Sequence, residues 1–383
     1  MKNFGDEQFI HVVGMYKSGT SWLLHVLASH PEIIAWREFD IIRAVYEYRR
    51  SPINFAGIIL NRVLRFIGHE AKLSTGPKAV LRDRETIIRN IFCGTGWIPM
   101  LGFDKQKEAS NIELSETDSF IDRLLAIDNM TLQAEDSPAL EPRAFHNTLG
   151  VANSRKIDLE NFFLAVLSAR DLRQVPSIYF NYLRNGVAPG SQIALKAADQ
   201  LMCIDQLRQV SPKSKKIVIV RDGRDVALSA MAFERLMSKW EAPWTPRKRD
   251  YLELLNTWAL RVSLLEKEII KGDLIVIRYE DLKINFDSTV KRLFQEMGLA
   301  NDLPLIQQIR GTTDFKVVSG GRSPGEEAEH VIRLGMTGEW KSKLSTAKAS
   351  MAWKMASYEL SLLGYRQDGG IDSWGDFLKR DTF

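Results

Sequence analysis

Residues 9–22 read Phe-Ile-His-Val-Val-Gly-Met-Tyr-Lys-Ser-Gly-Thr-Ser-Trp, an apolar run followed by a turn that contains glycine and lysine. The pattern predicts a buried strand at 9–14 and a helix at 20–29. Backbone N–H groups at such a strand-to-helix turn lack acceptors, and the helix dipole adds partial positive charge, so the turn favours phosphate or sulfate. We therefore predict an anion site at this turn.

The position of the lysine indicates which anion chemistry this turn serves. In a nucleoside-triphosphate P-loop the lysine directly follows the second glycine, and a Ser or Thr comes next to hold magnesium. Gly14 and Gly19 have the P-loop spacing, but Thr20 follows Gly19 and the lysine stands earlier, at Lys17. The turn is therefore poorly suited to a magnesium-triphosphate ligand.

A second candidate site is the segment Arg-Asp-Gly-Arg-Asp-Val-Ala-Leu-Ser at 221–229. Arg221 stands at the carboxyl edge of a predicted strand at 216–221, and Ser229 lies on the helix that follows. A guanidinium makes forked bonds to phosphate and a hydroxyl adds a donor, so the pair could hold a phosphomonoester. The alternative is an Arg221 that forms an ion pair with Asp225 or Asp222.

A third candidate is Ile-Arg-Leu-Gly-Met-Thr-Gly-Glu-Trp-Lys at 332–341, which follows a glycine-rich loop at 319–325. Its glycines permit close backbone approach, and Arg333 offers another anion contact. A surface turn that leads into the C-terminal helix is the alternative. Together the three elements predict a ligand with two separated anionic groups.

The elements that position these residues alternate between strand and helix. Strands are predicted at 192–196, 216–221 and 274–279, and helices at 199–210, 223–233, 250–271 and 286–298. This alternation predicts an α/β, P-loop-like three-layer fold, with a central mainly parallel sheet flanked by helices and ligands at the carboxyl ends of the strands. Residues 39–190 break the pattern and read as a large, mostly helical insertion in a single domain that spans 1–383.

The composition of the 383 residues excludes several classes of protein. Hydrophobic residues make up 45% and charged residues 26%, which is ordinary for a globular protein, and the net charge of +4 is too small to indicate nucleic acid. Two cysteines, Cys93 and Cys203, form neither a disulfide framework nor a metal motif. With no signal core and no apolar run long enough for a membrane span, we expect a cytoplasmic protein without a metal site. The sequence leaves the oligomeric state open.

These motifs, taken together, resemble those of the sulfotransferases that use 3′-phosphoadenosine 5′-phosphosulfate (PAPS). The family's phosphosulfate loop is similar to residues 16–22, its 3′-phosphate element to 220–229, and its glycine-rich closing loop to 333–341. Smaller matches follow in the same order, Val-Ile-Arg-Tyr-Glu-Asp-Leu at 276–282 and Thr-Asp-Phe at 313–315. The resemblance covers roughly residues 9–38 and 191–365, and it implies PAPS as cofactor and 3′-phosphoadenosine 5′-phosphate (PAP) as product.

The resemblance also implies roles for single residues. The backbone of Ser18, Gly19 and Thr20 and the hydroxyls of Thr20 and Ser21 would hold the 5′-phosphosulfate. Adenine would be enclosed by Trp22, Tyr279, Thr313 and Phe315, although Trp22, Tyr279 and Phe315 could equally be core aromatics. The 3′-phosphate would be held by Arg221, Ser229, Arg333 and the Gly335 N–H. Leu334 replaces a lysine found in many relatives, which removes one cation.

The catalytic roles rest on the same resemblance. Lys17 would neutralise the charge that builds on the bridging oxygen when sulfuryl transfers to a hydroxyl. Lys196 would steady the transferring group, or else be a solvated lysine at a strand end. The histidine base of cytosolic relatives is replaced by Ala198. Glu38 is the predicted general base and Asp199 the reserve candidate.

The acceptor is not defined by any motif. Residues 39–190 stand where the family builds its acceptor pocket, so we expect a small-molecule, glycan or lipid hydroxyl acceptor. Two other functions stay open: a P-loop kinase or other nucleoside triphosphatase, and a PAP-binding protein without catalytic activity.

Overall fold

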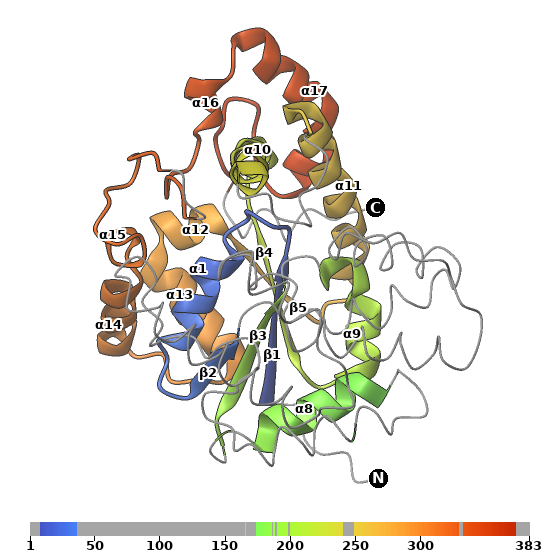
Figure 1. Ribbon diagram of the computed structural model, residues 1–383, viewed down its shortest axis with the longest axis vertical. Helices are drawn as coiled ribbons and strands as arrows, with labels where there is room; N and C mark the ends of the chain where they lie inside the picture. The colour runs from blue at the N-terminus through green and yellow to red at the C-terminus, as the bar shows by residue number, and fades with distance from the viewer. Residues whose placement is uncertain are drawn as a thin grey trace, which may run out of the picture. The chain divides into compact units, whose positions relative to one another are not determined.

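The computed structural model describes residues 8–36, 165, 174–185, 187, 190–197, 200–239, 249–328 and 332–372 (Figure 1). The predicted insertion at 39–190 lies mostly outside the described residues, so its helical character stays a prediction.

The described strands form one five-stranded sheet in the order β2-β3-β1-β4-β5. The strands are β1 (Phe9–Gly14), β2 (Ile33–Trp36), β3 (Gln192–Ala197), β4 (Lys215–Val220) and β5 (Leu274–Arg278). Strands β2 and β3 pair in parallel with Ile33 opposite Gln192, and β4 and β5 pair in parallel with Lys216 opposite Leu274. The predicted α/β fold, with a central parallel sheet flanked by helices, is confirmed.

The contacts divide the chain into two compact units, and the division falls within β1 and within the first helix, α1 (Thr20–Ala28). Unit 1 comprises Met1–His11, Leu24–Ser214 and Ala242–Trp244. Unit 2 comprises Val12–Leu23, Lys215–Glu241 and Thr245–Phe383. The prediction of one domain over 1–383 stays a prediction.

Unit 1 contains the pair β2 and β3 and the helices α8 (Val175–Asn185) and α9 (Ile204–Val210), with the 3₁₀ helix η7 (Gln200–Cys203) directly before α9. Its core includes Phe9, whose ring lies 4.7 Å from that of Phe180 on α8. The helix predicted to begin at 199 therefore begins as a 3₁₀ turn and becomes α-helical only at Ile204.

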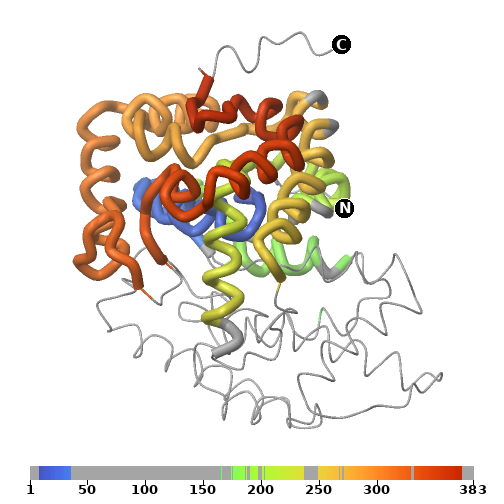
Figure 2. The backbone as a smooth tube through the Cα atoms, turned by 90° about the horizontal axis from the view of Figure 1, so that it is seen from above, coloured from blue at the N-terminus to red at the C-terminus, as the bar shows by residue number. Residues whose placement is uncertain are grey.

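Unit 2 contains β4, β5 and most of the described helices. These are α10 (Gly223–Lys239), α11 (Tyr251–Ile270), α12 (Tyr279–Ile284), α13 (Phe286–Met297), α14 (Leu303–Thr313), α15 (Phe315–Val318), α16 (Trp340–Lys343) and α17 (Thr346–Leu362). Helix α11 contacts α10, α17 and β5, and α13 contacts β5 and α12. Figures 1 and 2 show the red α17 alongside the yellow α11.

Strand β4 forms part of the buried core of unit 2. Its residues Lys-Lys-Ile-Val-Ile-Val are almost wholly buried, as a parallel strand covered on both faces requires.

Helix α11 begins with a capping box, in which Asp250 accepts from the Glu253 N–H at 2.8 Å and Glu253 accepts from the Asp250 N–H at 3.0 Å. The predicted helix at 250–271 is therefore confirmed, with Asp250 as its N-cap.

Within the described part of the chain, no helix combines the length and the apolar character needed to cross a membrane.

Candidate functional site

The turn after β1 has an unusual backbone conformation at Lys17. Its φ is 69°, and among the described residues it is the one non-glycine residue with positive φ. The turn closes when the Ser18 N–H and the Ser18 hydroxyl both donate to the Met15 carbonyl, at 3.1 and 2.5 Å. A left-handed residue other than glycine costs about 1–2 kcal/mol, so the surrounding contacts must hold Lys17 in place.

The start of α1 supplies the donors that the sequence predicts for an anion. Thr20 opens the helix, and the first N–H groups of a helix have no acceptor within it. The Ser18 N–H also donates within the turn, to the Met15 carbonyl. The predicted role of the Ser18 backbone toward an anion stays a prediction.

Gly19 and Trp22 connect this turn to the aromatic residues predicted to enclose adenine. A side chain at Gly19, whose φ is 101°, would overlap the Tyr279 ring. The Trp22 indole N–H donates to the Thr313 carbonyl at 2.8 Å, and its ring lies 5.4 Å from that of Tyr279. Trp22, Tyr279 and Thr313, far apart in the sequence, thus lie together beside the turn.

Arg221 joins two of the three predicted anion elements. It follows β4 directly and is 8% exposed. One of its terminal nitrogens donates to the Lys17 carbonyl at 3.3 Å, and the other donates to the Met336 carbonyl at 2.8 Å. Its guanidinium also lies 4.6 Å from the centre of the Tyr279 ring. The segments around Lys17, Arg221 and 332–341 therefore meet at one side chain.

Asp225 is the carboxylate that pairs with Arg221, at 3.7 Å, whereas Asp222 pairs with Arg224 at 2.7 Å. The fully buried Asp225 also accepts from the Gly338 N–H at 2.6 Å and from the Trp340 N–H at 3.0 Å. Burial raises the pKa of Asp225. The ion pair considered as an alternative is present, and it also fixes the segment 332–341.

Arg333 and Gly335 occupy the segment that Asp225 holds. Arg333 forms ion pairs with Glu339 and, at 3.2 Å, with Glu327. Gly335 has φ of 59°, and a side chain there would overlap the Phe315 ring. Leu334, which stands in place of the lysine of many relatives, is buried.

Two buried N–H groups remain without a partner at this place. They are the Nε atoms of Arg221 and Arg333. A buried donor without an acceptor is costly, and each belongs to a guanidinium, which binds phosphate well. These two groups therefore fit an anionic ligand.

Glu280 supports the turn that carries Arg221. Its carboxylate accepts from the Asp222 N–H at 3.2 Å and from the Tyr365 hydroxyl at 2.6 Å. Burial raises the pKa of Glu280 to about 7. The turn that carries Arg221 is thereby tied to the end of β5 and to the C-terminal turn.

The remaining predicted residues are placed as follows. Ser229 on α10 is buried, and Thr313 donates from its buried hydroxyl to the Ile309 carbonyl at 2.7 Å. Lys196, in unit 1, lies in β3 and is 5% exposed, so it is not a solvated lysine at a strand end. Glu38 and Asp199 lie outside the described residues, and their roles stay predictions.

Asp225 and Glu280 organise the candidate site, but the sequence does not mark them as organising residues. Both contacts of Asp225 with 332–341 join positions more than 100 apart, and no local pattern signals them. The described residues contain no group of three or more His, Cys, Asp or Glu side chains that could hold a metal ion.

A comparison with protein families identifies one match. Residues 112–302, about half of the chain, match the model of the sulfotransferase family. The matched segment includes Arg221, Ser229 and Tyr279 but neither Lys17 nor Arg333. No curated protein was found to be significantly similar to the chain in sequence.

The chain is similar to several solved structures, each at low identity. A sulfotransferase domain from the curacin biosynthetic pathway is 15% identical, with a TM-score of 0.46, 92% of this chain and 96% of that chain covered. Sulfotransferase STF9 from Mycobacterium avium is 13% identical, with a TM-score of 0.44 and coverage of 96% and 80%. Retinol dehydratase in complex with androsterone and PAP is 12% identical, with a TM-score of 0.41 and coverage of 96% and 83%.

Proposed function

The chain belongs to the sulfotransferase family, and we propose that it transfers a sulfuryl group from PAPS to a hydroxyl group of an acceptor. The observation that carries this proposal is the position of Arg221. It links the Lys17 carbonyl to the Met336 carbonyl, and so brings together the segments that resemble the two phosphate-binding ends of a PAPS site.

Binding would use both ends of the nucleotide. The backbone N–H groups of residues 18–20, with the hydroxyls of Thr20 and Ser21, would hold the 5′-phosphosulfate at the start of α1. Arg221 and Arg333, whose Nε donors lack partners, would hold the 3′-phosphate together with Ser229 and the Gly335 N–H. Trp22, Tyr279, Thr313 and Phe315 would enclose the adenine between these ends.

The chemistry follows from the charges. The acceptor oxygen attacks sulfur, and the bond between sulfur and the bridging oxygen breaks. The bridging oxygen keeps the electron pair and leaves as part of PAP. Lys17 would stabilise this growing negative charge, which is commonly worth about 10²- to 10³-fold in rate. The reaction as written needs no metal, and this independence is part of the proposal.

The acceptor hydroxyl must also lose its proton. We propose Glu38 as the general base and Asp199 as the reserve candidate, and Lys196 as a second cation for the transferring group. The acceptor class, a small molecule, glycan or lipid with a hydroxyl group, and the cytoplasmic location both remain predictions.

Radiolabelled PAPS and a panel of phenols, steroids, lipids and oligosaccharides would test the proposal. We expect labelled product with the wild-type protein, and a loss of about 10²- to 10³-fold in Lys17→Ala. Lys291→Ala, an exposed lysine on α13, is the matched control and should retain transfer.

Four results would contradict the proposal or the role of one of its residues. ATP hydrolysis without PAPS use would indicate a kinase or nucleoside triphosphatase. PAP binding without transfer to any acceptor would indicate a non-catalytic binding protein. Full transfer in Lys17→Ala would remove Lys17 from its role, and full transfer in Glu38→Gln would remove Glu38 and leave Asp199 for testing.

A further inference from the structure

Tyr16, the residue before Lys17, belongs to a polar cluster that none of the roles above uses. Its hydroxyl donates to Glu234 on α10 at 3.3 Å and accepts from Arg249 at 2.7 Å. Arg249, just before α11, forms an ion pair with Glu234 and donates to it from its backbone N–H at 3.3 Å. We call Tyr16, Glu234 and Arg249 the Tyr16 cluster.

The cluster is buried where it holds Tyr16. Glu234 is 3% exposed, and burial raises the pKa of Tyr16 above its ordinary value, so the phenol stays protonated. The Tyr16 hydroxyl can therefore donate to Glu234 Oε1 throughout the physiological pH range, and Arg249 donates to the same Glu234 oxygen. Each partner thus fixes the orientation of the Tyr16 ring.

The same turn of α10 also faces the neighbouring lysine. Phe233, adjacent to Glu234, lies with its ring centre 4.8 Å from the Lys17 ammonium and 6.4 Å from the Tyr16 ring. A cation at this distance from an aromatic face is attracted to it. Two consecutive residues of α10 therefore hold two consecutive residues of the turn.

The backbone of Lys17 is strained, so the contacts that hold the neighbouring residues affect its conformation. A residue with φ of 69° relaxes unless its neighbours are fixed. On the C-terminal side, Ser18 is fixed by the Met15 carbonyl, and the Lys17 carbonyl accepts from Arg221. On the N-terminal side, the side-chain anchor is the Tyr16 hydroxyl.

We infer that the Tyr16 cluster positions Lys17: it holds the turn in its left-handed conformation and directs the ammonium toward the leaving phosphate of the nucleotide. This inference rests on the proposed function. Tyr16 and Glu234 are positioning residues, since they would act through Lys17 without touching the ligand.

A double-mutant cycle with PAP as the probe tests the inference without an acceptor. We expect Lys17→Ala and Tyr16→Phe each to weaken PAP binding about tenfold, which is the size of one hydrogen bond to a charged group. In the Lys17→Ala background, Tyr16→Phe should add less than about twofold, because the group that it positions is already gone. Glu234→Gln is the second variant and should behave in the same way.

Tyr358→Phe is the matched control. Its hydroxyl donates to Glu266 at 2.6 Å, a similar tyrosine-to-glutamate bond at an exposed place on α17. PAP affinity should stay within about twofold in this variant. Thermal unfolding of every variant, measured beside PAP affinity, separates lost positioning from lost folding.

The outcomes separate this inference from the proposed function. Suppose that the wild-type protein binds PAP and that the double variant loses as much affinity as the product of the two single losses; the inference is then wrong while the proposed function stands. The same conclusion holds if neither Tyr16→Phe nor Glu234→Gln weakens PAP binding. If wild-type protein does not bind PAP, the proposed function is overturned and the inference with it. The inference is supported if the double variant loses less affinity than the product of the two single losses.

Discussion

Gly335 shows how a single residue without a side chain shapes the candidate site. It adopts φ of 59° and lies against the face of Phe315, so that a Cβ atom would overlap the ring. Both the left-handed conformation and the close approach favour glycine. Its backbone N–H is also one of the groups proposed to hold the 3′-phosphate.

Replacement of this glycine should therefore affect both folding and binding. We expect Gly335→Ala to lower the free energy of unfolding by about 1–3 kcal/mol and to weaken PAP binding. Gly311→Ala on α14 is the control, because nothing lies within 4 Å of a Cβ atom there. That change should be neutral or stabilising, since alanine favours the helix. Thermal unfolding and calorimetric titration with PAP give both quantities, and equal behaviour of the two variants would contradict the prediction.

The sequence indicates the chemistry of single residues, but it does not predict which residues they contact. Lys17 and Arg221 stand in recognisable patterns, and the structure brings their segments together. Asp225 appeared only as a possible ion-pair partner, since its bonds to Gly338 and Trp340 depend on tertiary folding. The positive φ of Lys17 was also not predicted, and the Lys17 carbonyl accepts from Arg221, which is distant in the sequence.

At the scale of elements, Asp225 joins the start of α10 to the segment 332–341, which includes the first residues of α16. It accepts two backbone N–H groups of that segment and balances the charge of Arg221. The loss of one partner from a buried ion pair leaves an uncompensated charge, which commonly costs about 3–5 kcal/mol. The conformation of segment 332–341 therefore depends on this carboxylate.

Asp225→Asn should thus destabilise the protein and loosen the candidate 3′-phosphate site. We expect the free energy of unfolding to fall by about 3 kcal/mol and PAP affinity to fall by tenfold or more. Asp205→Asn, in the exposed pair with Arg208 on α9, is the control and should change stability by less than about 1 kcal/mol. Denaturant unfolding measures both, and an Asp225→Asn variant as stable as the control would contradict this account.

The secondary-structure predictions were wrong where an element is short or where tertiary contacts determine the conformation. Strand β2 was not predicted, because its four residues follow Pro31 too closely to form a recognisable strand pattern. Tyr279, predicted as the end of a strand, begins α12 instead. The long runs that became β4 and α11 were predicted to within one residue at each end, since their burial pattern extends over the whole element.

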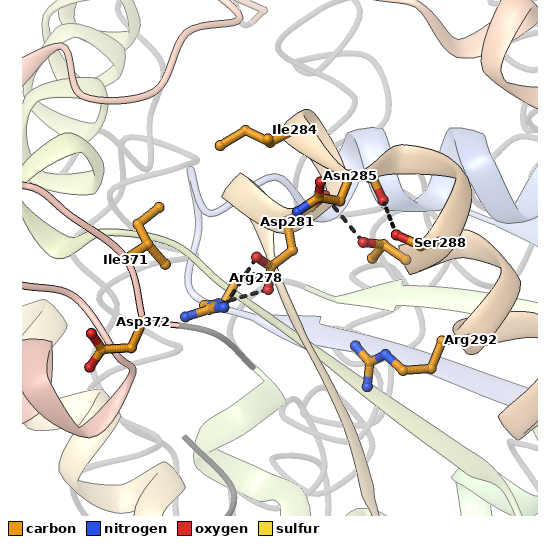
Figure 3. Close-up of a pocket in the computed structure, with 9 residues that line it drawn as sticks. Arg278, Asp281, Ile284, Asn285, Ser288, Arg292, Ile371 and Asp372 are labelled. Carbon is orange, nitrogen blue, oxygen red and sulfur yellow. Dashed lines mark hydrogen bonds and ion pairs between the residues drawn. The ribbon is translucent and has the colours of Figure 1, made fainter. Parts of the chain in front are cut away.

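A surface pocket in unit 2 shows that not every cavity is a candidate site. It has a volume of about 430 Å³ and is lined by residues of α12 and α13 and by Arg278, Ile371 and Asp372 (Figure 3). Arg278 there is already paired with Asp281, at 2.7 Å, and Figure 3 shows the two side chains facing each other. None of the residues predicted for the nucleotide site lines this pocket.

For the whole molecule, Glu280 links stability to pH. Burial raises its pKa from an ordinary 4.5 to about 7, so the folded chain binds this proton more tightly than the unfolded chain does. Its contribution to stability is therefore fully present below about pH 4.5 and is lost as the pH rises through about 7. The difference amounts to about 3 kcal/mol at most.

Glu280→Gln should remove this dependence, because an amide does not titrate in this range and can still pair with Tyr365. We expect the free energy of unfolding of the wild-type protein to fall more steeply between pH 5 and about 7.5 than that of the variant. Denaturant titrations of both proteins across this range measure the slopes. Parallel slopes would show that Glu280 does not carry the effect.

The whole of the candidate nucleotide site lies within unit 2, which contains Lys17, Arg221, Tyr279 and Arg333. The central claim is that this site recognises both ends of a bisphosphorylated adenosine. Calorimetric titration of the wild-type protein with PAP and with adenosine 5′-phosphate tests it most directly. We expect PAP to bind at least about 100-fold more tightly, since the guanidinium groups of Arg221 and Arg333 would hold the 3′-phosphate. Equal affinity for the two nucleotides would contradict it.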